Sequence, residues 1–304
     1  MAKYLLVSPD RYARFGHQTS SISTSLLLAY MTGSRVILPR YMYSCDKWNQ
    51  YVNFSRSKFV CAEVTGSHLS AVYLENWKTD NIGNRKWVFD NTQNVQQLLT
   101  QIANTDDNSI IFLPFDQTPG ILHRLYNQTR LREDIRGVFR FDNSIVSMDN
   151  PYVAIHIRRG DVNEESHPSW YVNNSFYIEL IERLCTILPN SFGIYICIQG
   201  DKSWLQRIRL TQLGLGRKFM VSSACAGFAN DYEVADFLTM KESTILFSAS
   251  SGFSHWASII GNQKLVVDVS RYNDTPLDWV KHLNPDSPTE SVWKTISSLA
   301  DRYN

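Results

Sequence analysis

The alternation of short apolar runs with helical patterns constrains the fold of this chain more than any other feature. In the second half, it predicts strands over 152–157, 192–198, 218–222, 244–248 and 264–269, and helices over 175–188, 204–213, 232–241 and 253–260. Strands that alternate with helices across short connections pair in parallel, because each crossover returns the chain to the same edge of the sheet. The second half is therefore predicted to form a doubly wound sheet.

The first half follows the same pattern less regularly. It predicts strands over 4–7, 35–39 and 109–115 and helices over 19–31, 98–103 and 120–140, while the stretch 41–95 has no clear pattern. A length of 304 residues fits about two domains. The polar segment 142–151 is the best linker, and a final helix is expected over 290–303. We expect an α/β fold with two Rossmann-like domains, 1–147 and 148–304, facing a central cleft.

Charge and composition exclude several classes of protein. The 30 Lys and Arg residues balance 29 Asp and Glu residues, for a net charge of +1, whereas nucleic-acid and membrane-surface binders usually carry a basic excess. With 43% hydrophobic and 19% charged residues, the chain is not disordered, collagenous or coiled coil. Any anion that the protein binds must therefore be met by a few local groups.

The sequence shows no signal for export or membrane insertion. The first apolar run, Tyr4–Val7, is too short for a signal peptide, and no stretch approaches about 18 apolar residues. The five cysteines are scattered without a Cys-x-x-Cys pair, which favours free thiols. We expect a cytoplasmic protein without an integral membrane segment, and the sequence does not predict its oligomeric state.

The segment Val153–Asp161 holds the strongest candidate site. Strand alternation puts His156 and Arg158 on one face and the apolar residues between them on the other. Arg158 and Arg159 then follow the strand at the carboxyl edge of the sheet, where open α/β folds bind ligands. A guanidinium group can donate two parallel hydrogen bonds to two oxygens of one phosphate, so the arginine pair predicts an anion site. The structural alternative is an ion pair with a nearby aspartate.

A second candidate lies between a predicted strand and the helix over 253–260. Ser250 and Ser251, followed by Gly252 and Phe253, place hydroxyl groups at the helix N-terminus. Free N–H groups and the positive end of the helix dipole make such a position suitable for an anion. Ordinary serine capping of the helix is the alternative.

Two weaker candidates occur elsewhere. Gly16 and His17 lie in the first predicted strand-to-helix loop, where glycine would allow close approach to a ligand, although a plain turn fits equally well. Asp236 precedes the serine cluster on a predicted helix, where a solvated aspartate is the alternative. No nucleotide-binding glycine loop and no metal-binding histidine or aspartate motif is present, so no metal and no cofactor is expected.

Three blocks of sequence resemble a known family. His156-Ile157-Arg158-Arg159-Gly160-Asp161 resembles the His-x-Arg-Arg-x-Asp motif of the fucosyltransferase superfamily of α-1,2-, α-1,6- and protein O-fucosyltransferases. Arg14–Gln18 and the following Arg35–Pro39 resemble the N-terminal loop and second strand of the protein O-fucosyltransferases, with His17 where that family has Asn. Asp236–Met240 followed by Ser250–Trp256 is similar to the third block of the α-1,2 enzymes.

The resemblance implies a GT-B glycosyltransferase that inverts the sugar linkage, uses GDP-fucose without a metal and transfers to a glycan hydroxyl. It implies that Arg158 binds the β-phosphate with support from Arg159, and that His156 lines the donor pocket. Ser250 and Ser251 would hold the diphosphate, and Asp236 would contact guanine.

The resemblance also implies a division of labour between the domains. The second domain would bind most of the donor, and the first would supply most of the acceptor side, with its Gly16 and His17 contributing to donor binding. Glu165 follows the arginine pair at a distance like that of a proposed base in the α-1,6 enzymes, although Glu164 and Glu165 are equally consistent with exposed loop residues.

Two other functions fit the same residues. The arginine and serine groups are suited to a diphosphate rather than to a particular sugar, so another nucleotide sugar is an alternative donor. A non-catalytic nucleotide- or glycan-binding protein on the same fold is the second alternative, because a fold alone does not establish chemistry.

Overall fold

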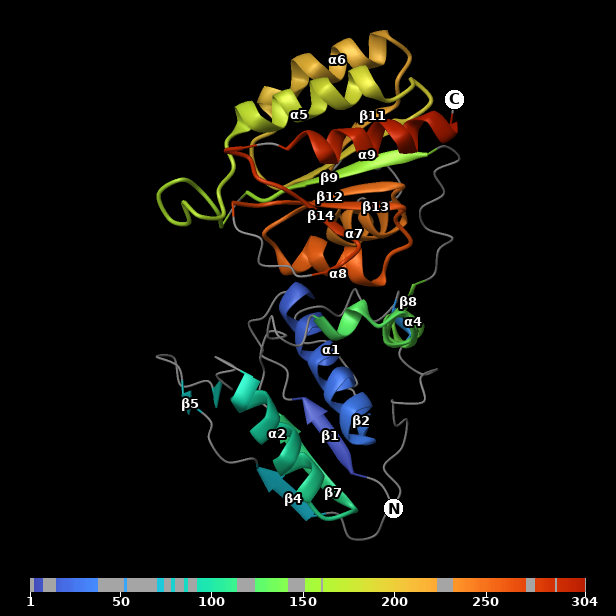
Figure 1. The fold of residues 1–304 in the computed structure, drawn as a ribbon. Helices are drawn as coiled ribbons and strands as arrows, with labels where there is room; N and C mark the ends of the chain where they lie inside the picture. Colours follow the sequence, from blue (N-terminus) through green and yellow to red (C-terminus); the bar gives the residue numbers. More distant parts are fainter. Residues whose placement is uncertain are drawn as a thin grey trace. The chain divides into compact units, whose positions relative to one another are not determined.

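The computed structural model divides the chain into two compact units, Met1–Asp142 and Asn143–Asn304. It describes residues 3–7, 15–37, 52–53, 70–73, 78–79, 85–86, 92–113, 124–141, 151–159, 161–222, 232–271, 277–287 and 289–303. Each unit is α/β and is built around a parallel sheet (Figure 1). Among the helices described, none is both long enough and apolar enough to cross a lipid bilayer.

The N-terminal unit contains a four-stranded sheet in the order β2-β1-β7-β4, with every neighbouring pair parallel. Its sheet strands are β1 (Tyr4–Val7), β2 (Arg35–Ile37), β4 (Ser70–Tyr73) and β7 (Ser109–Leu113). Its helices are α1 (Phe15–Thr32), α2 (Thr92–Asn104), η2 (Arg124–Asn127) and α4 (Thr129–Val138). Two short antiparallel pairs join β3 (Val52–Asn53) to β8 (Arg140–Phe141) and β5 (Lys78–Thr79) to β6 (Arg85–Lys86).

The structure corrects two sequence predictions in this unit. The single helix expected over 120–140 is two helices, because Gln128 has an extended backbone with ψ of 106° and begins α4 anew. The neighbouring Asn127 and Thr129 are residue types whose side chains compete with the helix for backbone hydrogen bonds. Helix α1 begins at Phe15, so Gly16 and His17 lie in its first turn rather than in a loop. In that turn the N–H groups have no intrahelical partner, so glycine is tolerated there.

The C-terminal unit is the more regular of the two. Its strands are β9 (Tyr152–Ile157), β10 (Gly193–Ile198), β11 (Phe219–Val221), β12 (Ile245–Ala249), β13 (Leu265–Val269) and β14 (Val280–Leu283). Its α-helices are α5 (Asn174–Ile187), α6 (Gln206–Gly214), α7 (Tyr232–Glu242), α8 (Gly252–Ile260) and α9 (Glu290–Ala300). Short 3-10 helices η4 (Ser203–Leu205) and η5 (Asp301–Tyr303) precede α6 and follow α9.

Two predictions for this unit were wrong in detail. Strand β14 lies inside the proline-rich segment 274–288, where no strand was expected, and it pairs in parallel with β13. The final helix ends at Ala300 rather than Tyr303, and its last residues tighten into η5. The other predicted strands and helices of this half form as expected.

The strand order of this unit decides where a ligand can bind. The all-parallel sheet runs β11-β10-β9-β12-β13-β14, which is the order 3-2-1-4-5-6 of a dinucleotide-binding Rossmann fold. From β9 to β11 successive strands are added on one side of β9, and from β12 to β14 they are added on the other side. In such a sheet, ligands usually bind in the crevice beyond the carboxyl ends of the two strands at this switch point, here β9 and β12. Arg158 follows β9, and Ser250 follows β12.

The two faces of the sheet have different roles. Helices α5, α6 and α9 cover one face and α7 and α8 the other (Figure 1). Val153, Ile155 and Ile157 of β9 belong to the fully buried cluster beneath α5, α6 and α9. The alternate residue His156 contacts Phe253 of α8 on the opposite face, which confirms the predicted alternation. The apolar face thus stabilises the sheet, while the other face carries the polar groups of the site.

Candidate functional site

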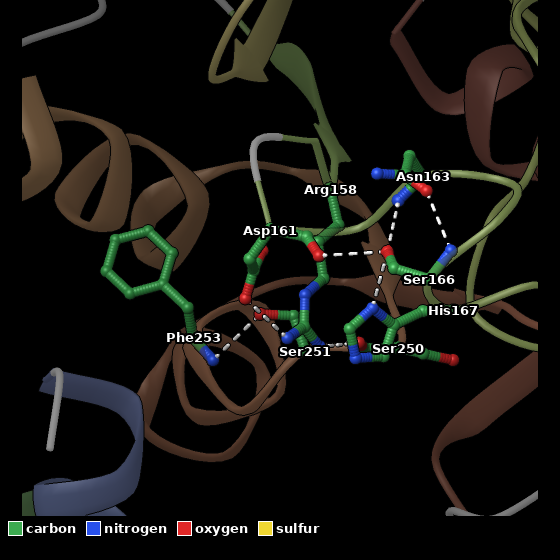
Figure 2. A network of polar contacts seen from close by, with 8 residues as sticks. All are labelled: Arg158, Asp161, Asn163, Ser166, His167, Ser250, Ser251 and Phe253. Atoms are coloured by element: carbon green, nitrogen blue, oxygen red, sulfur yellow. Dashed lines mark hydrogen bonds and ion pairs between the residues drawn. The ribbon is translucent and has the colours of Figure 1, made fainter.

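Arg158 joins the carboxyl ends of β9 and β12. Its Nη1 donates to the carbonyl oxygen of Ser250 at 2.6 Å, and its Nη2 donates to Oδ2 of Asp161 at 3.1 Å (Figure 2). The guanidinium carbon also lies 5.0 Å from the centre of the Trp170 ring. The ion pair with Asp161 is the structural alternative considered for this arginine, and it is present. It occupies only part of a group with five N–H donors, so further donors remain for an anion.

Arg159 points the other way and holds the following loop. Its Nη2 donates to the carbonyl oxygen of Val172 and to Oδ1 of Asn174, both at 2.7 Å. Its guanidinium carbon lies 4.6 Å from the ring centre of Tyr171 and 5.7 Å from that of Tyr177. These contacts anchor the loop to the start of α5. The predicted support of Arg159 for a donor phosphate stays a prediction.

The serine cluster forms the N-terminus of α8, as the sequence predicts. Ser251 is the N-cap residue, with an extended backbone, and its Oγ accepts from the backbone N–H of Phe253 at 3.3 Å (Figure 2). Ser250 directs its carbonyl oxygen to Arg158, and Gly252 begins the helix. Capping therefore uses one serine, while the first-turn amides, the helix dipole and a guanidinium meet at one place.

His156 lies beside this place with an unsatisfied nitrogen. Its Nδ1 is buried and has no hydrogen-bond partner. The imidazole packs against Phe253 with 5.9 Å between ring centres, and Phe253 in turn packs against Phe237 at 5.3 Å. Burial, together with the positive charge of Arg158, lowers the pKa of His156 to about 3. The ring is therefore neutral at pH 7.

Asp236 lies on the same face of the sheet but on the β10 side of β9. Its carboxylate accepts from Ser222 Oγ at 2.7 Å and from the Tyr195 hydroxyl at 3.3 Å, and the residue is only 8% exposed. Burial raises its pKa to about 7, against the opposing effect of both hydrogen bonds. It is therefore a buried, internally bonded group rather than the solvated helical aspartate considered as its alternative. Its contact with guanine stays a prediction.

The remaining predicted residues are not joined to Arg158 by any contact described. Gly16 and His17 lie in α1 of the N-terminal unit, and their place in donor binding stays a prediction. Glu165 is exposed on the loop after β9, and its backbone N–H donates to Asn163 Oδ1 at 3.0 Å. Its role as a base is likewise untested. Gly160 and Arg14 lie outside the described residues.

Sequence reasoning missed the aromatic loop that covers Arg158. Trp170 is 42% exposed, and its ring stacks on His167 with 4.9 Å between centres and 11° between planes. The signal was available, since His167-Pro168-Ser169-Trp170-Tyr171 places three aromatic residues in the loop that follows the arginine pair. Functional residues concentrate on such loops.

Within the described part of the chain, no group of three or more His, Cys, Asp and Glu side chains could hold a metal ion.

No protein-family model matches the sequence, and no curated protein sequence matches it. Solved structures do. A mutant of Arabidopsis thaliana FUT1 in complex with GDP matches with a TM-score of 0.55 and 12% identity, covering 91% of this chain and 72% of that one. NodZ α-1,6-fucosyltransferase co-crystallised with GDP matches with a TM-score of 0.51 and 12% identity, covering 86% and 93%. At this identity the similarity shows the fold alone.

The fold prediction is thereby confirmed. The chain has the α/β fold with two parallel sheets, of four and six strands, that is found in GT-B glycosyltransferase structures.

Proposed function

We propose that this protein is an inverting, metal-independent glycosyltransferase that moves L-fucose from GDP-fucose to a glycan hydroxyl. The observation that carries the proposal is the contact between Arg158 and Ser250, which brings a guanidinium to the N-terminus of α8 at the switch point of the sheet. The GT-B fold supports a transferase, and the three sequence blocks that resemble fucosyltransferases support the donor.

The chemistry of a departing diphosphate fits these groups. When the bond between the sugar and the β-phosphate breaks, negative charge builds up on the phosphate oxygen. Arg158 and the first-turn amides of α8 are oriented before the reaction begins, and the Ser250 and Ser251 hydroxyls lie at the same helix N-terminus, so these donors stabilise that charge with little reorganisation. This arrangement supplies the charge stabilisation for which other transferases use a metal ion.

The other predicted residues take supporting roles. The neutral His156 lines the donor pocket, and Phe253 forms an apolar wall beside it. Asp236 meets the guanine, and Arg159 keeps the loop after β9 in place next to the phosphates. The C-terminal unit binds most of the donor, with Gly16 and His17 of the N-terminal unit contributing to donor binding, and the N-terminal unit supplies the acceptor side.

A panel of nucleotides tests the donor. A ligand that binds only the folded protein raises its melting temperature, and at a concentration of 100 times Kd it adds about 2.7 kcal/mol of stability. We expect GDP to raise the melting temperature, and UDP, dTDP and ADP to have a smaller effect. Stabilisation by UDP, dTDP or ADP alone would replace GDP-fucose with another nucleotide sugar.

Transfer itself is tested by incubating the protein with GDP-fucose on a glycan array, followed by mass spectrometry of the products. Arg158→Ala should abolish transfer and leave the fold intact, because Arg158 acts at the departing phosphate. Arg207→Ala, at an exposed arginine of α6 in the same unit, is the control and should transfer normally. Normal turnover by Arg158→Ala would refute the proposal, and GDP binding without transfer to any glycan would favour a binding protein.

A further inference from the structure

The loop between β9 and α5 presents an oriented imidazole next to Arg158. His167 is half-buried, and its ring stacks on Trp170 at 4.9 Å. Trp170 in turn lies 5.0 Å from the guanidinium carbon of Arg158. One indole therefore bridges the imidazole and the guanidinium that the proposed function assigns to the β-phosphate.

Ser166 offers the imidazole a hydrogen-bond partner on one nitrogen. Its Oγ lies 2.9 Å from Nδ1 of His167 and 3.5 Å from the carbonyl oxygen of Asp161, and it accepts from the backbone N–H of Asn163 at 3.4 Å (Figure 2). In the tautomer whose Nδ1–H donates to this oxygen, the lone pair of the neutral ring is on Nε2.

The loop that carries His167 is held at several points. The backbone N–H of His167 donates to the carbonyl oxygen of Asn163 at 3.0 Å, and the His167 carbonyl accepts from the N–H groups of Trp170 and Tyr171, both at 3.0 Å. Arg271 donates from Nη1 to the carbonyl of Tyr171 at 2.7 Å and also contacts the carbonyl of Pro168. A side chain on such a braced loop can keep the fixed position that proton transfer requires.

The reaction needs a proton acceptor at this distance from the phosphate. In an inverting transfer, the hydroxyl attacks the sugar carbon from the face opposite the departing phosphate, with about 3–3.5 Å between the reacting atoms. The base must lie about 2.6–3.2 Å from that hydroxyl. It therefore belongs about one sugar ring away from the phosphate-binding group rather than in contact with it. His167 stacks on the same indole that Arg158 approaches, which puts the imidazole in the neighbourhood of the phosphate-binding group without a described contact to it.

We infer that Nε2 of His167 is the general base of the transfer, an inference that rests on the proposed function. As the acceptor oxygen forms its bond to C1 of fucose, the bond between C1 and the β-phosphate oxygen breaks, and its electron pair stays on GDP. The proton of the acceptor hydroxyl passes to Nε2, and the imidazolium then releases it to water. The products are the fucosylated acceptor, GDP and one proton.

Glu165 is the competing group on the same loop. The described contacts hold its backbone through Asn163 but do not orient its exposed carboxylate. His167, in contrast, is oriented by Ser166 on one nitrogen and by Trp170 on one ring face. A base that a third group orients is the usual arrangement in proton transfer, which favours His167.

Charged groups surround His167 from three elements. Asp161, Glu164 and Glu165 lie on its own loop, with Asp161 linked through Ser166. Arg158, which follows β9, lies over the Trp170 ring that His167 stacks on, and Arg271, which follows β13, reaches the loop through its carbonyls. Asp236, whose pKa burial raises to about 7, titrates in the neutral range as well, so the variants below rather than the pH profile alone assign a change of rate to His167.

Release of GDP from GDP-fucose, with water as the acceptor, tests the inference. His167→Asn removes Nε2 and keeps a polar atom near the position of Nδ1. A general base contributes about 100-fold or more, so we expect at least that loss in kcat, with an unchanged rise in melting temperature on adding GDP. The wild-type rate should fall at acid pH, and this acid limb should be missing in His167→Asn. Added imidazole should restore part of the rate to His167→Gly.

Two further variants separate a base from a structural residue. Asn163→Ala loosens the loop without removing the imidazole, so it should lower the rate and keep the acid limb. Glu165→Gln tests the competing group: loss of the acid limb in that variant would overturn the inference. Retention of the acid limb in His167→Asn would overturn it equally. If the wild-type protein neither binds GDP nor releases it from GDP-fucose, the proposed function fails and takes this inference with it.

Discussion

The buried carboxyl of Asp236 should make the protein less stable as the pH rises. Burial raises its native pKa to about 7, whereas the ordinary value is 3.8. Between these two pH values the native state holds a proton that the unfolded chain has lost. The free energy of unfolding therefore falls by about 1.4 kcal/mol per pH unit from about pH 4 to pH 7, and the loss is complete above pH 7.

Asp236→Asn removes this dependence while keeping the hydrogen bonds. The amide is neutral at every pH, and its Nδ2 can donate to Ser222 Oγ, whose hydroxyl lies 3.1 Å from the carbonyl oxygen of Ile196 and can donate there. The stability of the variant relative to wild type should therefore rise with pH. From pH 5 to pH 8, the range over which the native carboxyl loses its proton, the change is about 2 to 3 kcal/mol in favour of the variant.

Urea unfolding followed by tryptophan fluorescence at pH 5 and pH 8 measures this difference. The dependence on urea concentration must be the same in both proteins, so that a shift of the midpoint reports stability. Asp201→Asn is the matched control. Asp201 is exposed, and hydrogen bonds from Ser203 lower its pKa, so it stays ionised from pH 5 to pH 8 in both states. If the difference in unfolding free energy between Asp236→Asn and wild type is the same at both pH values, the raised pKa of the buried Asp236 carboxyl is refuted.

Three further predictions use the same unfolding assay. The pKa of His156 is lowered to about 3, so the wild type loses stability as the pH falls below about 6.5. Relative to wild type, His156→Gln should therefore gain about 2 kcal/mol of unfolding free energy when the pH is lowered from 7 to 5. A relative gain of stability on raising the pH would contradict the direction of this pKa shift. Arg159→Lys loses the hydrogen bonds to Val172 and Asn174 and should cost about 2 kcal/mol at any pH, and an unchanged midpoint would show that these bonds do not hold the loop. Ser251→Ala removes the N-cap of α8 and should cost about 1 kcal/mol, whereas an equal loss in Ser250→Ala would place the cap elsewhere.

Much of the fold of the C-terminal unit could be predicted from local patterns. The apolar runs and helical stretches define most of its elements, because periods of 2 and 3.6 residues reflect burial on one face. Strand β14 was not predicted because its residues are only partly buried and proline-rich sequence surrounds it. In the N-terminal unit, the break at Gln128 was not predicted because Asn127 and Thr129 also occur inside helices, and only the backbone conformation separates η2 from α4.

The candidate site was predictable as a set of residue types but not as an arrangement. The order of the strands, which puts β9 next to β12, depends on contacts between residues some 90 positions apart, such as Arg158 and Ser250. The two arginines look equivalent in the sequence, yet Arg158 reaches Ser250 and Arg159 turns back to its own loop. Adjacent side chains of an extended chain point in opposite directions, so neighbours acquire different roles.

The sequence by itself determined the alternation of strands and helices, the basic pair at the end of a strand and the serines at the start of a helix. These are local features, which depend on residue type and spacing alone. The tertiary structure decided that Arg158, His156 and the N-terminus of α8 share one edge of the sheet, and that Trp170 lies over the arginine. It also decided that Asp236 is buried. Burial and long-range contacts depend on how the chain is packed, and packing is not encoded at any single position.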